Sequence, residues 1–143
     1  MRLPDGEVTV YDDFAHHPTA IRTTVDGLRR QLDKSHANPH QRILAVFEPR
    51  SNTMKLGTMK ALLPWALEEA DLSFGLQGDY GWSVRDALAP LGANAAVADG
   101  VDALVAAVAK AARPGDHVVC MSNGGFGGIH AKLLAALAAK KPQ

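Results

Sequence analysis

The chain has 143 residues, of which 47% are hydrophobic and 21% are charged, a composition typical of one soluble globular domain with a sizeable core. Fifteen basic residues balance fifteen acidic ones, so neither a nucleic acid nor an anionic membrane is an expected partner. The single cysteine, Cys120, excludes an internal disulfide framework and favours a cytoplasmic location, and its apolar neighbours predict a buried thiol.

The first half of the chain reads as strands alternating with helices. A Pro-Asp-Gly turn at residues 4–6 predicts a short edge strand pairing antiparallel with the strand that contains Val8–Tyr11. From Pro18, a residue suited to the first helical position, apolar residues recur at helical spacing as far as Leu32. The continuous apolar run Ile43–Phe47 then predicts a strand buried on both faces.

The second half continues the same alternation. A helical pattern at residues 56–67 contains Pro64 and predicts a kink or two short helices, and residues 71–75 predict another core strand. Ser83 is expected to cap a helix that Gly92 ends. The remaining elements expected are strands at 95–98 and 117–121, a helix around Leu104–Val108 capped by Asp99, and a helix at 129–137. This order predicts an α/β fold: a three-layer, Rossmann-like, mostly parallel sheet of about six strands with one antiparallel edge strand.

Three polar segments follow predicted strands, at residues 12–17, 48–55 and 122–128. Strand ends of this kind meet at the carboxyl edge, where open α/β sheets bind ligands. The glycine-rich third segment could approach an anion through its backbone or could simply form a tight turn. The sequence has no G-x-x-x-x-G-K-[ST], so it contains no phosphate-binding P-loop of its own.

The first of these segments places Asp12, Asp13, His16 and His17 within six residues. One interpretation is a functional site, with His17 beside a helix N-terminus, and the other is a strand end followed by a turn. A stand-alone metal hydrolase using these four side chains is disfavoured, because neighbours in one loop rarely converge on one ion and no second cluster completes a coordination shell.

Three stretches carry a resemblance to a known family: Asp12-Asp-Phe-Ala-His-His-Pro-Thr-Ala-Ile21, Phe47-Glu-Pro-Arg-Ser-Asn-Thr-Met-Lys55 and Met121-Ser-Asn-Gly-Gly-Phe-Gly-Gly128. In this order they resemble the C-terminal domain of the Mur ligases, the ATP-dependent ligases of peptidoglycan assembly. They look most like the branch that joins the tripeptide L-Ala-γ-D-Glu-meso-diaminopimelate to UDP-N-acetylmuramate in cell-wall recycling. The alternative is the sister branch that adds L-alanine, which typically has Pro-His-Arg-Tyr in place of Pro49-Arg-Ser-Asn52.

The resemblance implies that residues 1–143 are the C-terminal domain of a longer enzyme, whose UDP-sugar domain and central ATPase domain lie outside this sequence. Such an enzyme uses ATP and Mg²⁺, held mainly by the central domain, and activates the muramyl carboxylate as an acyl phosphate for attack by the peptide's amine. Alone, the chain is expected to be inactive because it lacks a P-loop. A non-catalytic module that binds a nucleotide or peptide is therefore a further alternative.

The resemblance also implies roles for individual residues. Asp13 matches the family's aspartate near the nucleotide and its water or metal network, and it is the expected catalytic residue. His16 and His17 match positions beside the adenosine, while no residue here is expected to bind a metal directly. The expected peptide contacts are Arg50, Ser51, Asn52, Ser122, Asn123, Gly124 and Gly125.

Overall fold

The computed structural model describes residues 8–13, 18–34, 42–48, 62–77, 83–113, 116–122 and 128–139. Its strands are β1 (Thr9–Asp13), β2 (Ile43–Phe47), β3 (Leu72–Leu76), β4 (Ala95–Ala98) and β5 (His117–Met121). Its helices are α1 (Pro18–Lys34), α3 (Val84–Ala87), α4 (Val101–Ala111) and α5 (Ile129–Ala139), with a 3-10 helix η1 (Ala89–Asn94). Residues 62–66 are also helical.

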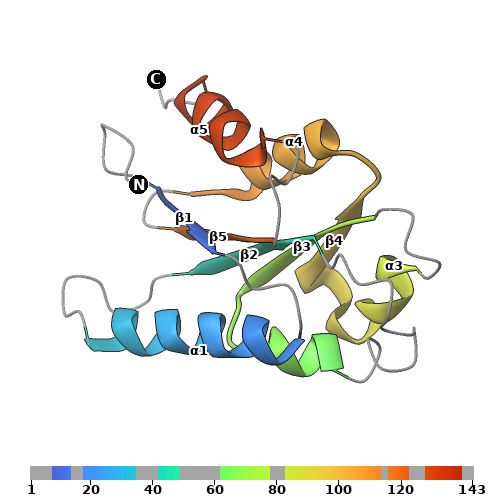
Figure 1. Ribbon diagram of the computed structural model, residues 1–143. Coiled ribbons are helices and arrows are strands. Elements are labelled where there is room, and N and C mark those ends of the chain that lie inside the picture. The colour runs from blue at the N-terminus through green and yellow to red at the C-terminus, as the bar shows by residue number, and fades with distance from the viewer. Residues whose placement is uncertain are drawn as a thin grey trace.

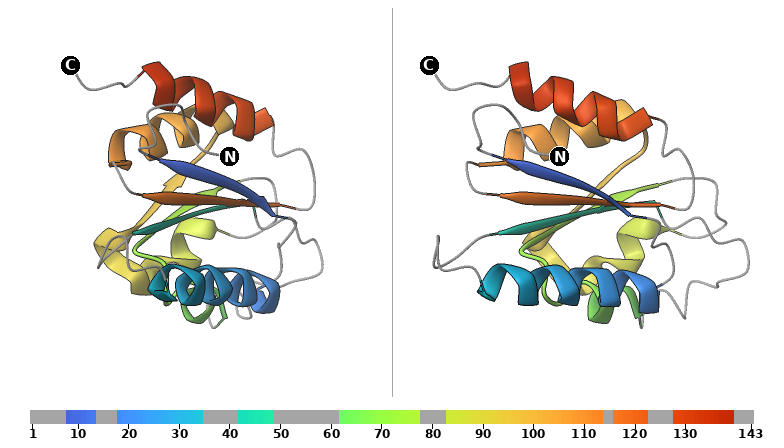
Figure 2. Two further views of the ribbon diagram at one scale, coloured as in Figure 1. Left: turned by 90° about the vertical axis from the view of Figure 1, so that its left-hand side faces the viewer. Right: turned by 60° about the vertical axis from the view of Figure 1, so that its left-hand side comes forward.

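The strands form one sheet in the order β1-β5-β2-β3-β4, and every neighbouring pair is parallel. Helix α1 covers one face, and α4 and α5 cover the other, which gives three layers (Figures 1 and 2). The predicted α/β fold is confirmed with five strands among the described residues instead of about six. The expected antiparallel edge strand lies outside those residues.

Two apolar clusters sandwich the sheet, because side chains alternate between its faces along each strand. Ile43, Ala45 and Phe47 of β2 pack toward α1, while Leu44 and Val46 pack toward α4 and α5. Every residue of β2 and β5 is buried, as expected for central parallel strands. Of the described helices, none is long and apolar enough to cross a membrane.

The thiol of Cys120 is buried in the cluster between the sheet and α5, which confirms the predicted buried cysteine. Burial raises the pKa of the Cys120 thiol to about 12, and the nearby Asp12 carboxylate adds a smaller rise. Because a thiol reacts as its thiolate, this cysteine is chemically inert near neutral pH.

The helix expected from Ser83 to Gly92 is shorter than predicted. Ser83 does cap it, since its hydroxyl accepts a hydrogen bond from the Asp86 backbone N–H at 3.1 Å. Helix α3 nevertheless ends at Ala87, and η1 follows with Gly92 inside it at φ 59°. Pro90 explains the break, because it has no N–H to donate to the preceding turn and disfavours helical backbone in the residue before it.

Two further expectations concern helix boundaries. Asp99 does not cap α4: the N-cap is Gly100, in extended conformation at φ −150° and ψ 160°, and its carbonyl accepts the Leu104 N–H at 2.9 Å. Pro64 lies inside the helical residues 62–66. Of the rest of the helix predicted around it, residue 67 is in a turn and residues 56–61 lie outside the described residues, so the expected kink or pair of short helices stays a prediction.

An ion pair joins the amino ends of β2 and β5. Arg42, just before β2, holds the buried Asp116, just before β5, through two hydrogen bonds of 3.0 and 2.6 Å. The Arg113 backbone N–H donates a third bond to Asp116 at 2.8 Å. Hydrogen bonding to Asp116 raises the pKa of the Arg42 guanidinium above its usual range. This pair fixes the end of the sheet that lies away from the candidate site.

Gly75 of β3 has no room for a side chain. A Cβ there would lie 2.8 Å from Val84 Cγ1 and 3.2 Å from Phe47 Cζ, and both residues are fully buried. We expect Gly75→Ala to lower the free energy of unfolding by about 1–3 kcal/mol, because a buried β-branched side chain yields only if α3 moves.

The matched control for this change is Gly27→Ala on α1, where nothing lies within 4 Å of the new Cβ. Alanine there should be neutral or stabilising by up to about 1 kcal/mol, since it favours the helix. Urea unfolding of both variants checks the prediction, and equal stability of the two would contradict it.

Candidate functional site

Three neighbouring strands bring polar residues to the carboxyl edge of the sheet. Asp13 is the last residue of β1, Ser122 follows β5, and Glu48 follows β2. The backbone ladder extends one step past the strands: the Ser122 N–H donates to the Asp13 carbonyl at 3.0 Å, and the Glu48 N–H donates to the Met121 carbonyl at 3.1 Å. The starts of all three segments that the sequence marked as functional are therefore side by side.

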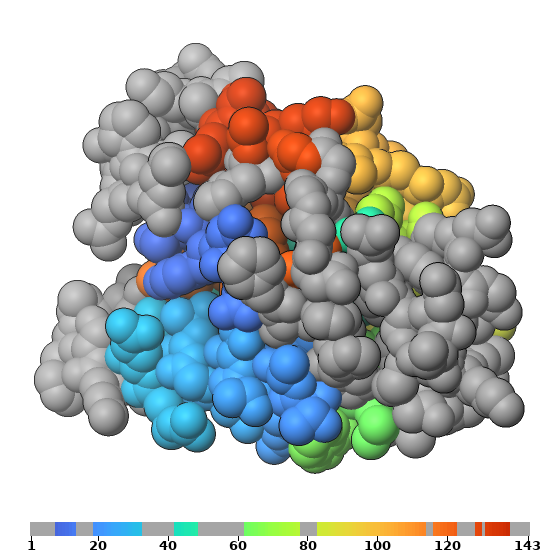
Figure 3. Space-filling model, in the orientation of Figure 1, coloured from blue at the N-terminus to red at the C-terminus, as the bar shows by residue number. Residues whose placement is uncertain are grey.

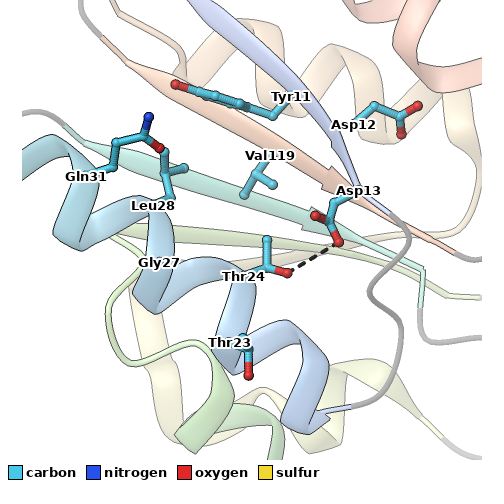
Figure 4. Close-up of a pocket in the computed structure, with 9 residues that line it drawn as sticks. All are labelled: Tyr11, Asp12, Asp13, Thr23, Thr24, Gly27, Leu28, Gln31 and Val119. Atoms are coloured by element: carbon cyan, nitrogen blue, oxygen red, sulfur yellow. Dashed lines mark hydrogen bonds between the residues drawn. The ribbon is translucent and has the colours of Figure 1, made fainter.

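The carboxylate of Asp13 is half-buried and points toward α1 (Figure 4). The Thr24 hydroxyl of α1 donates to Asp13 Oδ1 at 3.3 Å. Asp12 is exposed and points toward the opposite face, as the alternation along a strand predicts. Within the described ranges, no group of three or more His, Cys, Asp or Glu side chains is placed to hold a metal ion.

A shallow pocket of about 270 Å³ runs between β1 and α1, with Asp13 and Thr24 at one end. Leu28 and Val119 give it apolar lining, and Tyr11 stands at the other end (Figure 4). The Tyr11 hydroxyl is hydrogen-bonded to His117 Nδ1 at 2.8 Å, which fixes the ring. Among the described strands, β1 lies at one end of the sheet, and it reaches the surface between α1 and α5 (Figure 3). The pocket makes the α1 side of Asp13 accessible.

Glu48 and Ser122 meet on the other side of the sheet edge. Their predecessors, Phe47 and Met121, pack toward α1, so alternation directs Glu48 and Ser122 toward the layer of α4 and α5. The Ser122 hydroxyl donates to Glu48 Oε1 at 2.7 Å. Ser122 is only 5% exposed, whereas Glu48 is half-buried. Sequence reasoning did not single out Glu48; its only signal was an acidic residue directly after a fully apolar strand.

Of the predicted site residues, Asp13 and Ser122 are described, and they lie on adjacent strands. The others lie outside the described residues, and their roles stay predictions: His16, His17, Arg50, Ser51, Asn52, Asn123, Gly124 and Gly125.

Comparison with known proteins identifies the family. Residues 2–124 match the family described as Mur ligase, glutamate ligase domain. A UDP-N-acetylmuramate–L-alanyl-γ-D-glutamyl-meso-2,6-diaminoheptandioate ligase of Escherichia coli K12 is 50% identical over 141 residues, which cover 98% of this chain and 30% of that protein. A ligase of the same name from Haemophilus influenzae is 46% identical over 94% of the chain. A UDP-N-acetylmuramate–L-alanine ligase of Mycolicibacterium gilvum is 33% identical over 94% of the chain.

Solved structures agree with the sequence relatives. A domain from Haemophilus ducreyi, named for a UDP-N-acetylmuramate:L-alanyl-γ-D-glutamyl-diaminopimelate ligase, superposes with a TM-score of 0.74 at 47% identity, covering 92% of both chains. A murein peptide ligase of Psychrobacter arcticus superposes with a TM-score of 0.81 at 36% identity, covering 96% of this chain and 29% of that one.

The fold, the carboxyl-edge site and these matches define a class: the chain belongs to the Mur ligase family and is a Mur ligase C-terminal domain. The predicted resemblance is confirmed, and the murein peptide ligases are among its close relatives. The chain spans about 30% of the length of the curated relatives it matches.

Proposed function

We propose that this chain is the C-terminal domain of a murein peptide ligase, an ATP-dependent enzyme that joins L-Ala-γ-D-Glu-meso-diaminopimelate to UDP-N-acetylmuramate. The observation that carries the proposal is 50% identity, over 98% of the chain, to a ligase whose name states these substrates. The alanine-adding alternative is supported by relatives at 33% identity. In this proposal the ligase works in the cytoplasm, in peptidoglycan recycling, and the UDP-sugar and ATPase domains belong to the rest of the polypeptide.

The reaction would run through an acyl phosphate on the muramyl carboxylate, which the peptide's amino group attacks with release of phosphate. Little covalent chemistry falls to the protein in such a step, so positioning and charge stabilisation would carry most of the rate. This domain would hold the incoming peptide and close onto the nucleotide-bearing domain, and closure would complete the site.

The described residues are suited to making one contact with the nucleotide, and they do not form its main binding site. The Asp13 carboxylate is accessible from the α1 side and oriented by the Thr24 hydroxyl, which fits a contact to a nucleotide hydroxyl or to a water on Mg²⁺. His16 and His17 would contact the same nucleotide. ATP and Mg²⁺ would be held mainly by the other domains, because this sequence has no P-loop.

The experiment compares the 143-residue chain with the longer polypeptide that we propose contains it. The chain alone should release no phosphate from ATP above a boiled control. The longer protein should form ADP only when both UDP-N-acetylmuramate and the tripeptide are present, with a product of the corresponding mass. Phosphate release by the chain alone would contradict the proposal that ATP is held mainly by the other domains. Absence of the product from the longer protein would contradict the ligase itself.

A further inference from the structure

The described carboxylates that are withdrawn from solvent follow a pattern. Away from the carboxyl edge, each one pairs with an arginine: Asp26 with Arg22 at 3.0 Å, Asp71 with Arg29 at 2.7 Å, and Asp116 with Arg42 at 2.6 Å. A partly buried charge is costly without a counter-charge, so these pairings are the expected arrangement.

Glu48 departs from this pattern. It is half-buried at the carboxyl edge, and its side-chain partner among the described residues is the neutral hydroxyl of Ser122. A carboxylate has about four acceptor positions, and this hydrogen bond occupies one of them, on Oε1. The negative charge is thus held in place by Ser122 without being neutralised by a cation of the described part of the chain.

The Ser122 hydroxyl also has a defined orientation. A serine hydroxyl has one proton, and that proton is given to Glu48. Ser122 therefore cannot donate the same proton to a ligand, and the pair presents acceptors and negative charge at the sheet edge. Groups that match such a surface are positively charged donors, and a primary ammonium is the simplest of them.

We propose that Glu48, held by Ser122, contacts an ammonium group of the incoming peptide and supplies part of the specificity for it. The inference rests on the proposed function, since L-Ala-γ-D-Glu-meso-diaminopimelate has one ammonium at its alanyl end and another at its diaminopimelyl end. Glu48 complements the Arg50 expected to bind a carboxylate of the same peptide, because a zwitterionic ligand requires both signs of charge.

The test is steady-state kinetics of Glu48→Gln in the full-length ligase, with tripeptide and ATP varied in turn. Glutamine has nearly the same shape and its amide oxygen still accepts the Ser122 hydroxyl, so only the charge is lost. We expect the KM for tripeptide to rise about ten- to a hundred-fold, the value of one charge-assisted hydrogen bond, with the KM for ATP unchanged. Glu48→Ala should have a similar effect on the KM for tripeptide.

Asp116→Asn is the matched control, because Arg42 and Asp116 precede the same two strands that Glu48 and Ser122 follow. It removes a carboxylate charge at the far end of the β2–β5 pair and should lower stability while leaving both KM values unchanged. A purely structural role for Glu48 predicts wild-type kinetics for Glu48→Gln and impaired kinetics for Glu48→Ala. That result would overturn the proposal.

The N-acetylated tripeptide, used as a competitive inhibitor, distinguishes the two ammonium groups because it lacks the alanyl one. If Glu48 contacts the alanyl end, Glu48→Gln should leave the inhibition constant of this analogue unchanged. If it contacts the diaminopimelyl end, the constant should rise by the same factor as the KM. Failure of the wild-type enzyme to use tripeptide would instead contradict the proposed function, and activity of the wild type with unchanged kinetics of Glu48→Gln would contradict this inference alone.

Discussion

Asp13→Ala in the full-length ligase is expected to lower kcat by about a hundred-fold while leaving the fold intact. Asp13 ends β1 at the carboxyl edge, and its carboxylate is held by the Thr24 hydroxyl and accessible from the α1 side. We propose that this carboxylate contacts the nucleotide or its water network, and loss of one preorganised polar group at an active site can cost about 10²–10³ in kcat, as the removal of an oxyanion-hole donor does. Turnover at saturating ATP and peptide, together with a circular dichroism spectrum, checks the expectation.

Asp12→Ala is the control for that experiment, because it removes the neighbouring carboxylate from the other face of the same strand. Asp12 is exposed, so its loss should disturb neither the fold nor the nucleotide side of the site. We expect kcat within about three-fold of the wild type, since surface changes are usually small. Wild-type turnover by Asp13→Ala would make Asp13 a structural strand end.

Arg50→Ala should raise the KM for tripeptide about ten- to a hundred-fold and leave the KM for ATP nearly unchanged. Arg50 follows the buried strand β2 by three residues, in the segment that the family resemblance assigns to the amino-acid substrate. Its guanidinium can hold a carboxylate through two parallel hydrogen bonds, and the tripeptide has carboxylates that alanine lacks. Loss of a charge-assisted pair is worth about 1.5–3 kcal/mol, which corresponds to that range in affinity.

The control for Arg50 is Arg30→Ala, an exposed arginine on α1 whose removal changes the net charge by the same amount. Both KM values should stay at their wild-type levels in that variant. An effect of Arg50→Ala confined to ATP would place Arg50 at the nucleotide site. No effect on either substrate would make it a solvated side chain.

Much of the fold could be predicted from local patterns of apolar residues, because each pattern is compatible with few structures. A five-residue apolar run such as Ile43–Phe47 is compatible with few environments other than a central strand, and it is fully buried. Helix boundaries were harder to predict, because single residues decide them. Pro90 ends α3 earlier than the apolar spacing suggested, and Gly100 takes the cap position that Asp99 was expected to fill.

The candidate site was predictable in outline because parallel strands bring their carboxyl ends to one edge. The hydrogen bond between Ser122 and Glu48 was not predictable, because the two residues are 74 positions apart in the sequence and meet only through the register of β2 and β5. Neither the strand order nor that register can be predicted from the local sequence. No described arginine pairs with Glu48, in contrast with Asp71 and Asp116, and the local sequence gives no sign of this difference.

The most direct test of the central claim is a competition between the tripeptide and L-alanine for UDP-N-acetylmuramate on the full-length enzyme. Equal concentrations of both amines, limiting UDP-sugar and mass spectrometry of the products give the ratio of the two kcat/KM values. The account predicts that the tripeptide product dominates, because the tripeptide has further carboxylates and a second ammonium for the contacts proposed for Arg50 and Glu48, and L-alanine lacks them. A mixture dominated by the alanine product would contradict it.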